Sequence, residues 1–130
     1  MREITLRSER RTQLLEITRE VQEAIVGTDA SAALVFVPHT TAGVTVNEHA
    51  DPAVARDFER ALERMVGDDW GWEHIEAGEE NAPSHIRASL MGSQVVVPVQ
   101  DGRLALGTWQ GIFFCEFDGP RQRKVLVTAL

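Results

Sequence analysis

Cysteine is nearly absent from this chain of 130 residues, which contains only Cys115. A single cysteine cannot form an intramolecular disulfide, and it excludes a structural zinc site built from cysteine ligands. The amino-terminal residues MREITLRSERR are charged and contain no apolar stretch, unlike a secretory signal. We therefore expect the protein in the reducing cytoplasm, with Cys115 as a small core residue rather than a nucleophile.

Positive charge and aromatic side chains are also scarce. The formal net charge is −7, and the chain has five phenylalanines, three tryptophans and no tyrosine. Nucleic-acid binding needs clustered cations or stacking platforms, so a nucleic-acid partner is not expected. No run of about 18 apolar residues is present, so no membrane span is expected either. A small phosphorylated metabolite remains compatible, because it requires only a few well-placed cations.

The composition is that of one globular domain. Hydrophobic residues make up 43% and charged residues 25% of the sequence, which are ordinary values. The length is sufficient for one buried core, and no internal repeat or long linker interrupts it. Residues 1–130 are therefore predicted to form a single domain.

Short apolar or alternating segments, separated by turn residues such as Asp101-Gly102, predict a fold rich in strands. The predicted strands are Glu3–Arg7, Gln13–Ile17, Ala33–Pro38, one starting at Val44, Gln94–Val99, Arg103–Gly107, Trp109–Phe117 and Lys124–Leu130. Helical spacing predicts two main helices, Thr18–Val26 and Asp51–Val66, and a short helix over Pro83–Met91. Tight turns favour a mostly antiparallel sheet, with the two main helices packed on one face. The predicted class is α+β.

Histidine placement is the most informative feature for function. His39 follows a buried strand, His74 lies in a long acidic loop, and His85 lies in the short helix; the fourth is His49. Three imidazoles from distant segments can hold zinc and leave a fourth position open. Acceptors that could orient such rings are Glu48, Glu73, Glu76, Glu79 and Glu116. The alternative is that the histidines are unrelated surface residues.

Polar residues follow His39 along the chain. Thr40 and Thr41 can offer donors to an anion from a turn, and Asn47 and His49 share one face of the strand that follows. The alternative is a polar hairpin in which the threonines only favour strand structure.

The segment GTWQG sets Trp109 and Gln110 between two glycines. Glycine within a strand often marks a bulge or a close approach of the backbone. The segment is therefore either a pocket wall beside a ligand, or a bend in a twisted sheet with Trp109 in the core.

Charged residues near the carboxyl terminus have two interpretations each. Glu116 interrupts an apolar strand, where a carboxylate must be paired or functional. Arg121 and Arg123 lie in the turn DGPRQRK and can clamp a phosphate, because the guanidinium matches its geometry. The alternative for them is a solvated turn.

The motifs HTTAGVTVNEHADP and ENAPSHIRASLMGSQVVVPVQDGRLALGTWQGIFFCEFDGPR resemble the YjbQ family, from about residue 2 to Leu130. The resemblance implies a compact α+β homotrimer with a metal or anion site near the subunit boundaries. It also implies that His39, His74 and His85 bind a divalent metal such as zinc. Arg87 stands where the family has lysine, and His49 where it has asparagine.

The resemblance further implies weak thiamine-phosphate synthase activity, which joins a pyrimidine diphosphate to a thiazole phosphate and releases pyrophosphate. We expect Glu116, Glu48 and Arg121 to act in catalysis. The expected substrate-binding residues are Thr40, Thr41, Asn47, Trp109 and Gln110. One alternative is a zinc-dependent hydrolase with Glu116 or Glu48 as the base. Another is a non-catalytic protein that binds a metabolite or a metal.

Overall fold

The computed structural model describes residues 1–75 and 80–130. Along the chain it contains β1 (Arg2–Arg7), β2 (Gln13–Glu16), α1 (Thr18–Ile25), β3 (Ala32–Phe36), β4 (Ala42–Glu48), α2 (Pro52–Met65), α3 (Ala82–Met91), β5 (Gln94–Gln100), β6 (Arg103–Leu104), β7 (Gln110–Glu116) and β8 (Gln122–Ala129).

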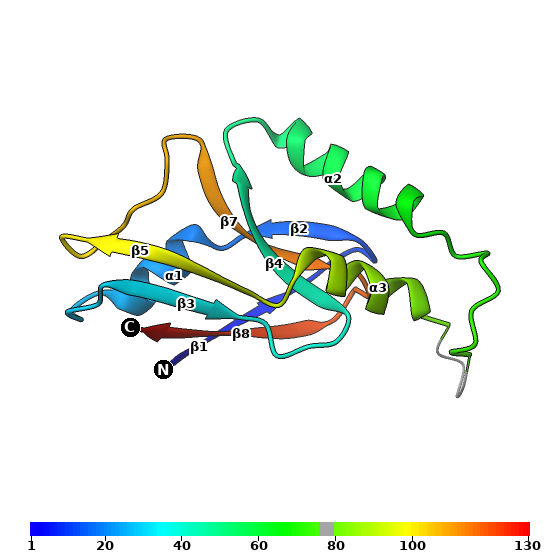
Figure 1. Cartoon of the computed structure of the whole chain (residues 1–130), viewed down its shortest axis with the longest axis horizontal. Helices are drawn as coiled ribbons and strands as arrows, with labels where there is room; N and C mark the ends of the chain where they lie inside the picture. The colour runs from blue at the N-terminus through cyan, green and yellow to red at the C-terminus, as the bar shows by residue number, and fades with distance from the viewer. Residues whose placement is uncertain (76–79) are drawn as a thin grey trace.

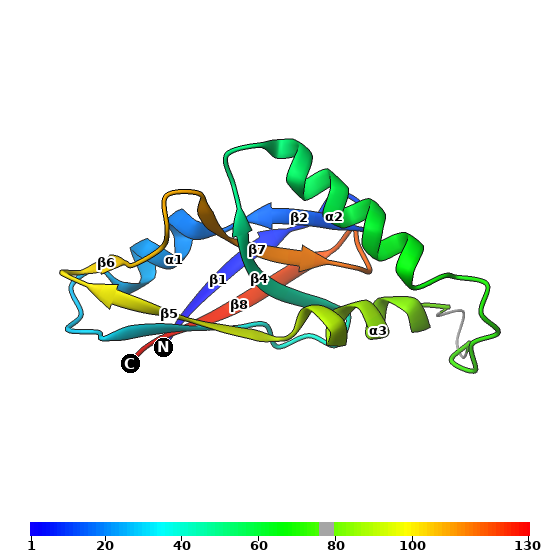
Figure 2. The same ribbon diagram turned by 45° about the horizontal axis from the view of Figure 1, so that its top comes forward.

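The strands form two antiparallel sheets (Figure 1). One has five strands in the order β1-β8-β3-β5-β6, and the other has three in the order β2-β7-β4. The two termini lie near each other in Figures 1 and 2. The predicted α+β class and antiparallel pairing are confirmed. No helix in the described ranges 1–75 and 80–130 has the length and apolar character that crossing a membrane requires.

Strand β7 is the centre of the packing, because it is buried on both faces. Ile112 and Phe114 point into a core between the two sheets, which α1 closes. Phe113, Cys115 and Phe117 point the other way, into a smaller core beneath α2 and α3. Burying one phenylalanine side chain stabilises the fold by roughly 1.5–3 kcal/mol. The helices are therefore distributed differently from the expected pair on one face: α1 and α2 contribute to opposite sides of β7.

Local signals located the start of α2 but not the caps of the other helices. The Asp51 side chain accepts a hydrogen bond from the Ala53 N–H at 2.9 Å, as the Asp-Pro start of α2 predicts. Thr18 is the first residue of α1 and not its cap. Its hydroxyl accepts from the Ile112 N–H at 2.9 Å and donates to Glu16. A tertiary contact thus replaces the local cap.

A buried ion pair closes one end of the core between the sheets. Glu116 continues the inward face of β7 after Ile112 and Phe114, and Arg123 begins the inward face of β8. Glu116 is 0% and Arg123 4% exposed. Arg123 donates from Nε to Glu116 Oε1 at 2.9 Å and from Nη2 to Oε2. The pair links the two sheets where an apolar contact would otherwise lie.

This pair should make the free energy of unfolding depend on pH in the acidic range. Burial alone raises the pKa of Glu116, but hydrogen bonds from Arg123 and Ser8 outweigh it and hold the pKa below its ordinary value of 4.5. A lowered folded-state pKa gives stability that is present above the unfolded value and is lost as pH falls through the folded value. We expect the urea midpoint of the wild type to fall more steeply than that of Glu116→Gln below about pH 4.5. Parallel pH profiles would contradict this assignment.

Candidate functional site

His39 and His85 line the same open cavity, of about 640 Å³, together with Thr40, Thr41, Arg121 and Arg123. We call it the histidine cavity. His39, Thr40 and Thr41 come from the connection between β3 and β4, whereas His85 comes from the first turn of α3. The two arginines come from the end of the turn before β8 and from β8 itself. Three segments that are distant in sequence therefore meet here.

The backbone of β8 fixes the His39 ring. Phe36 of β3 pairs with Leu126 of β8, and this register would bring Pro38 opposite Lys124. Proline has no N–H to donate. The His39 ring takes the vacant position instead, with Nε2 3.1 Å from the Lys124 nitrogen and 3.2 Å from its carbonyl oxygen. A neutral ring makes one of these contacts at a time: an unprotonated Nε2 accepts from the Lys124 N–H, whereas a protonated Nε2 donates to the Lys124 carbonyl and leaves Nδ1 for a ligand.

The protonation of His39 suits ligand binding. Burial, followed by the positive charge of Arg123, lowers the pKa of His39 below its usual value of 6.5. The ring is therefore neutral at neutral pH, which is the form that binds metals. If Nε2 carries the proton, it donates to the Lys124 carbonyl and leaves the Nδ1 lone pair free. This is the arrangement that a metal-binding histidine commonly has.

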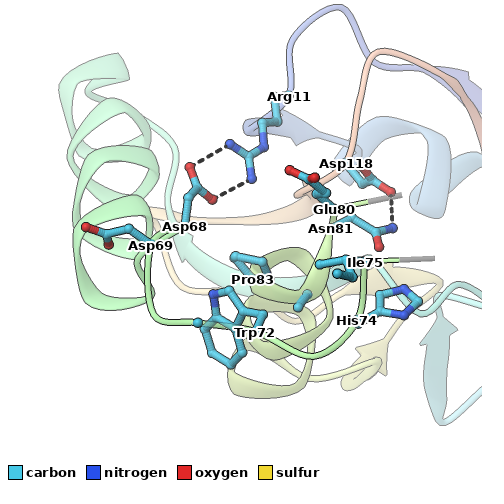
Figure 3. A pocket seen from close by; sticks show the side chains of 12 residues that line it. Arg11, Asp68, Asp69, Trp72, His74, Ile75, Glu80, Asn81, Pro83 and Asp118 are labelled. Atoms are coloured by element: carbon cyan, nitrogen blue, oxygen red, sulfur yellow. Dashed lines mark hydrogen bonds and ion pairs between the residues drawn. The ribbon is translucent and has the colours of Figure 1, made fainter. Parts of the chain in front are cut away.

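His74 reaches the same region from an adjoining cavity of about 400 Å³ (Figure 3). Asn81 and Asp118 line both cavities, and the Asn81 Nδ2 donates to Asp118 Oδ2 at 2.9 Å. The ring centroids of His74 and His85 are 5.2 Å apart, with an angle of 79° between the planes. The three histidines named from the sequence thus gather in one region of a single chain.

The buried Arg87 fixes α3, and with it His85. Its guanidinium donates from Nε to the Leu62 carbonyl at 3.2 Å and from Nη2 to the Val66 carbonyl at 2.7 Å. These carbonyls belong to the last turn of α2 and the residue after it, where a cation is favourable. Arg87 therefore joins two helices and lies outside the histidine cavity.

The cavity wall includes two arginines with different surroundings. Arg121 is about half exposed, and it donates from Nη2 to Asp118 Oδ2 at 3.0 Å and from Nε to the Asp118 carbonyl at 2.9 Å. These contacts orient its guanidinium at the rim, where an anion can reach it. Arg123 is buried in the ion pair with Glu116.

Glu116 forms a buried ion pair, which was the structural alternative to a catalytic role. Besides Arg123, its carboxylate accepts hydrogen bonds from the Ser8 hydroxyl at 2.6 Å and from the N–H groups of Phe117 and Asp118 at 3.1 and 3.0 Å. Both carboxylate oxygens are thus occupied by donors. A general base needs a lone pair facing the substrate, so the geometry gives Glu116 no such role.

The remaining expected site residues lie at the other end of β4. Ala42, beside the histidine cavity, pairs with Glu116, whereas Glu48 pairs with Gln110. Six residues of extended strand separate these positions by about 20 Å. Asn47 and Trp109 lie at the distant end as well. One chain therefore does not bring them or Glu48 to the three histidines.

His49 and Trp109 also belong to this distant end. The His49 Nδ1 is 2.7 Å from Glu16 Oε2, and this hydrogen bond raises the pKa of His49. Trp109 is 63% exposed, so it is not the core residue of the bend interpretation. Gly111 permits the contact, because a Cβ there would lie 2.7 Å from Glu16 Oε2.

The three histidines are not yet arranged as a closed metal site. Within residues 1–75 and 80–130, no group of three or more His, Cys, Asp or Glu side chains is close enough to hold one ion. Glu76 and Glu79, named as possible acceptors, lie outside the described residues. Cys115 cannot contribute, because it is buried and its burial raises the thiol pKa far above its ordinary value.

Sequence reasoning missed Asn81 and Asp118 as residues of the site. Asn81 is the cap residue of α3, but its side chain makes no cap hydrogen bond and donates to Asp118 instead. The only sequence signal was an asparagine ahead of a helix, which favours capping. Asp118 reads as an ordinary turn residue in DGPRQRK.

Residues 2–130 match the family described as UPF0047 protein YjbQ-like. The chain is 42% identical to UPF0047 protein YugU of Bacillus subtilis, over 98% of this chain and 96% of that protein. A solved structure of a YjbQ/UPF0047 protein from Clostridium acetobutylicum has a TM-score of 0.94 at 44% identity and covers 100% of both chains. A conserved hypothetical protein from Thermus thermophilus has a TM-score of 0.91 at 36% identity, again with 100% of both covered. The chain therefore belongs to the YjbQ-like UPF0047 family.

Proposed function

We propose that the chain is a metal-binding enzyme with weak thiamine-phosphate synthase activity, centred on the histidine cavity. The observation that carries the proposal is the meeting of His39, His74, His85 and Arg121 from separate segments around adjoining cavities. Neutral imidazoles are ligands that zinc prefers, and a guanidinium binds phosphate. A metal and a phosphorylated metabolite are thus complementary to the same wall.

Zinc is the proposed ion, held by His39, His74 and His85. The chemistry of the donors fits, since the rings of His74 and His85 are adjacent, and Nδ1 of His39 is free for a ligand in the tautomer whose Nε2 donates to the Lys124 carbonyl. Binding would draw the His74 segment and His39 towards His85. When bound, the ion would supply positive charge that stabilises phosphate oxygens.

In the proposed reaction, the thiazole nitrogen forms a bond to the methylene carbon of the pyrimidine diphosphate. The carbon–oxygen bond breaks, and pyrophosphate leaves with the electron pair. No proton transfer is required, which agrees with the lack of an available base at Glu116. Arg121 would bind the departing pyrophosphate, and the exposed Thr40 would donate to a substrate phosphate. Alignment of the two reacting atoms by the cavity would supply the remaining acceleration.

A zinc-dependent hydrolase fits the geometry less well. It needs a base beside the metal-bound water. Glu116 has both oxygens occupied by donors, and Glu48 lies at the far end of β4. The non-catalytic alternative requires only the cavity, and it is separated from the synthase by the measurements below.

Replacing one proposed ligand should remove the metal. We expect purified wild-type protein to bind one zinc ion per chain and His85→Ala to bind none, as measured by elemental analysis after dialysis. His49→Ala is the matched control, because His49 is paired with Glu16 at the far end of β4. It should retain the full zinc content. Equal zinc in all three proteins would reject the site.

Synthase activity should depend on Arg121. We expect wild-type protein to rescue growth of a thiamine auxotroph that lacks thiamine-phosphate synthase. Arg121→Gln should lower kcat/KM for thiamine phosphate formation by about 100-fold, the usual cost of losing one donor to a developing charge. The exposed Arg103, in β6, provides the control Arg103→Gln. Failure of folded, zinc-loaded wild type to rescue growth would favour the non-catalytic alternative.

We also propose a homotrimer. Four exposed apolar side chains support it: Phe36 at the end of β3, Val96 on β5, and Ile86 and Leu90 one turn apart on α3. Phe36 also lines the histidine cavity. Exposed apolar groups of this kind favour burial against another protein surface. A trimer using them would set the cavity near a subunit boundary.

A charge at one of these exposed apolar positions should prevent assembly. We expect Val96→Lys to convert the trimer to a monomer, because Val96 is 56% exposed in the chain alone and would be buried in the trimer. The mass should be measured by light scattering coupled to size exclusion. Val26→Lys is the control, since Val26 is 68% exposed but follows α1. A monomeric wild type, or a trimeric Val96→Lys, would refute the proposed assembly.

A further inference from the structure

Arg123 makes contacts on two sides of its guanidinium. On one side it binds the carboxylate of Glu116. On the other side, Nη2 donates to the Thr41 hydroxyl at 2.8 Å and contacts the Thr41 carbonyl at 3.3 Å. Thr41 is 4% exposed, so this contact is shielded from water. Through Thr41, the ion pair therefore holds the segment that carries His39 and Thr40 in place.

Lys124, the residue after Arg123, holds the other end of the same segment. The Lys124 backbone holds the His39 ring: its N–H donates to an unprotonated Nε2, or its carbonyl oxygen accepts from a protonated Nε2. The three-residue segment His39–Thr41 is thus fixed at its first residue by Lys124 and at its last by Arg123. The Thr41 carbonyl also accepts from the Phe117 N–H at 3.1 Å. Any shift of Arg123 would move both attachment points together.

Glu116 determines where Arg123 lies. Its carboxylate is held by the Ser8 hydroxyl and two backbone N–H groups. Gly119 packs against this cluster, since a Cβ there would lie 2.5 Å from the Ser8 hydroxyl oxygen and 3.0 Å from Glu116 Cγ. A side chain fixed from several directions is a suitable support for a functional group.

We propose that Glu116 and Arg123 are positioning residues that orient His39 and Thr41 in the histidine cavity, and that Glu116 does not act as a base. For its metal-binding readout the proposal rests on the function proposed above. Its second readout, the state of the His39 ring in the metal-free protein, does not.

The test compares Glu116→Gln and Thr41→Val with a matched control, Glu59→Gln. Glu59 is 7% exposed and accepts from Arg10 Nη2 at 2.9 Å and from the Leu14 N–H at 3.1 Å. The control therefore removes the same charge from a buried carboxylate that does not line the histidine cavity, and whose partner Arg10 is 57% exposed. Thr41→Val replaces only the hydroxyl, with a methyl group. It therefore tests the contact between Arg123 and Thr41 if Glu116→Gln folds poorly.

Two quantities are measured on each variant: zinc affinity by chelator competition, and the ring ¹⁵N chemical shifts of His39 in metal-free protein at constant pH. We expect Glu116→Gln and Thr41→Val to weaken zinc binding by about 10–100-fold, the usual effect of removing a group that orients a ligand. Their His39 shifts should move towards the values of exchanging tautomers. Glu59→Gln should lower the melting temperature but match the wild type in both readouts.

The outcomes separate the two proposals. Wild-type zinc affinity and wild-type His39 shifts in Glu116→Gln would overturn the positioning role while leaving the zinc site in place. Equal changes in Glu59→Gln would also overturn it, because they would reflect general loosening. If the wild type binds no zinc, the metal proposal fails, and the His39 shifts alone decide whether the pair positions the ring.

Discussion

The ion pair between Glu116 and Arg123 is the interaction on which the rest of this structure depends. Taking two charges out of water costs several kcal/mol per ion, and their attraction offsets this only when further hydrogen bonds satisfy both groups. Here the Ser8 hydroxyl and two N–H groups complete the carboxylate, while Thr41 completes the guanidinium. An apolar pair could fill the same space between the sheets. An apolar pair could not bind the polar segment His39–Thr41. The same two side chains therefore complete the core and fix the wall of the histidine cavity.

Strand β4 separates two polar regions that lie close together in the sequence. His39 and His49 are ten positions apart, yet an extended strand runs between them and carries them to opposite ends of the three-stranded sheet. In a helix the same spacing would cover only about 15 Å. The first region contains the three proposed zinc ligands, and the second contains the pair of His49 with Glu16. Proximity in sequence along a strand is therefore a poor guide to membership of one site.

Much of the fold could be predicted because the signals are local. Alternation and turn residues identified the strands, and Asp51 with Pro52 identified the start of α2. The distribution of the helices could not be predicted, because the apolar run in β7 shows only that both faces are buried. Whether a sheet or a helix covers each face depends on partners distant in sequence. Thr18 and Asn81 illustrate the same limit, since tertiary contacts outcompeted local capping.

For the site, the residues alone left the histidines ambiguous, and the resemblance to a family selected three of the four. The structure gathers those three in adjoining cavities and leaves His49 at the distant end. Motif membership placed four further residues with them, although a shared motif says nothing about distance in the fold. These residues are Asn47, Glu48, Trp109 and Gln110. Glu116 presented the opposite difficulty. A carboxylate in an apolar strand signals something unusual, but only its partners distinguish a base from a support.

Pro38 connects the fold to the site, because it ends the pairing of β3 with β8 next to His39. A residue with an N–H at this position could have extended the pairing of β3 with β8 and occupied the Lys124 backbone. Proline cannot donate, so the strand ends and the imidazole of His39 takes its place. A ligand on Nδ1 would require the proton on Nε2, where it strengthens the bond to the Lys124 carbonyl. Ligand binding and the end of the pairing between β3 and β8 would then stabilise each other through a single ring.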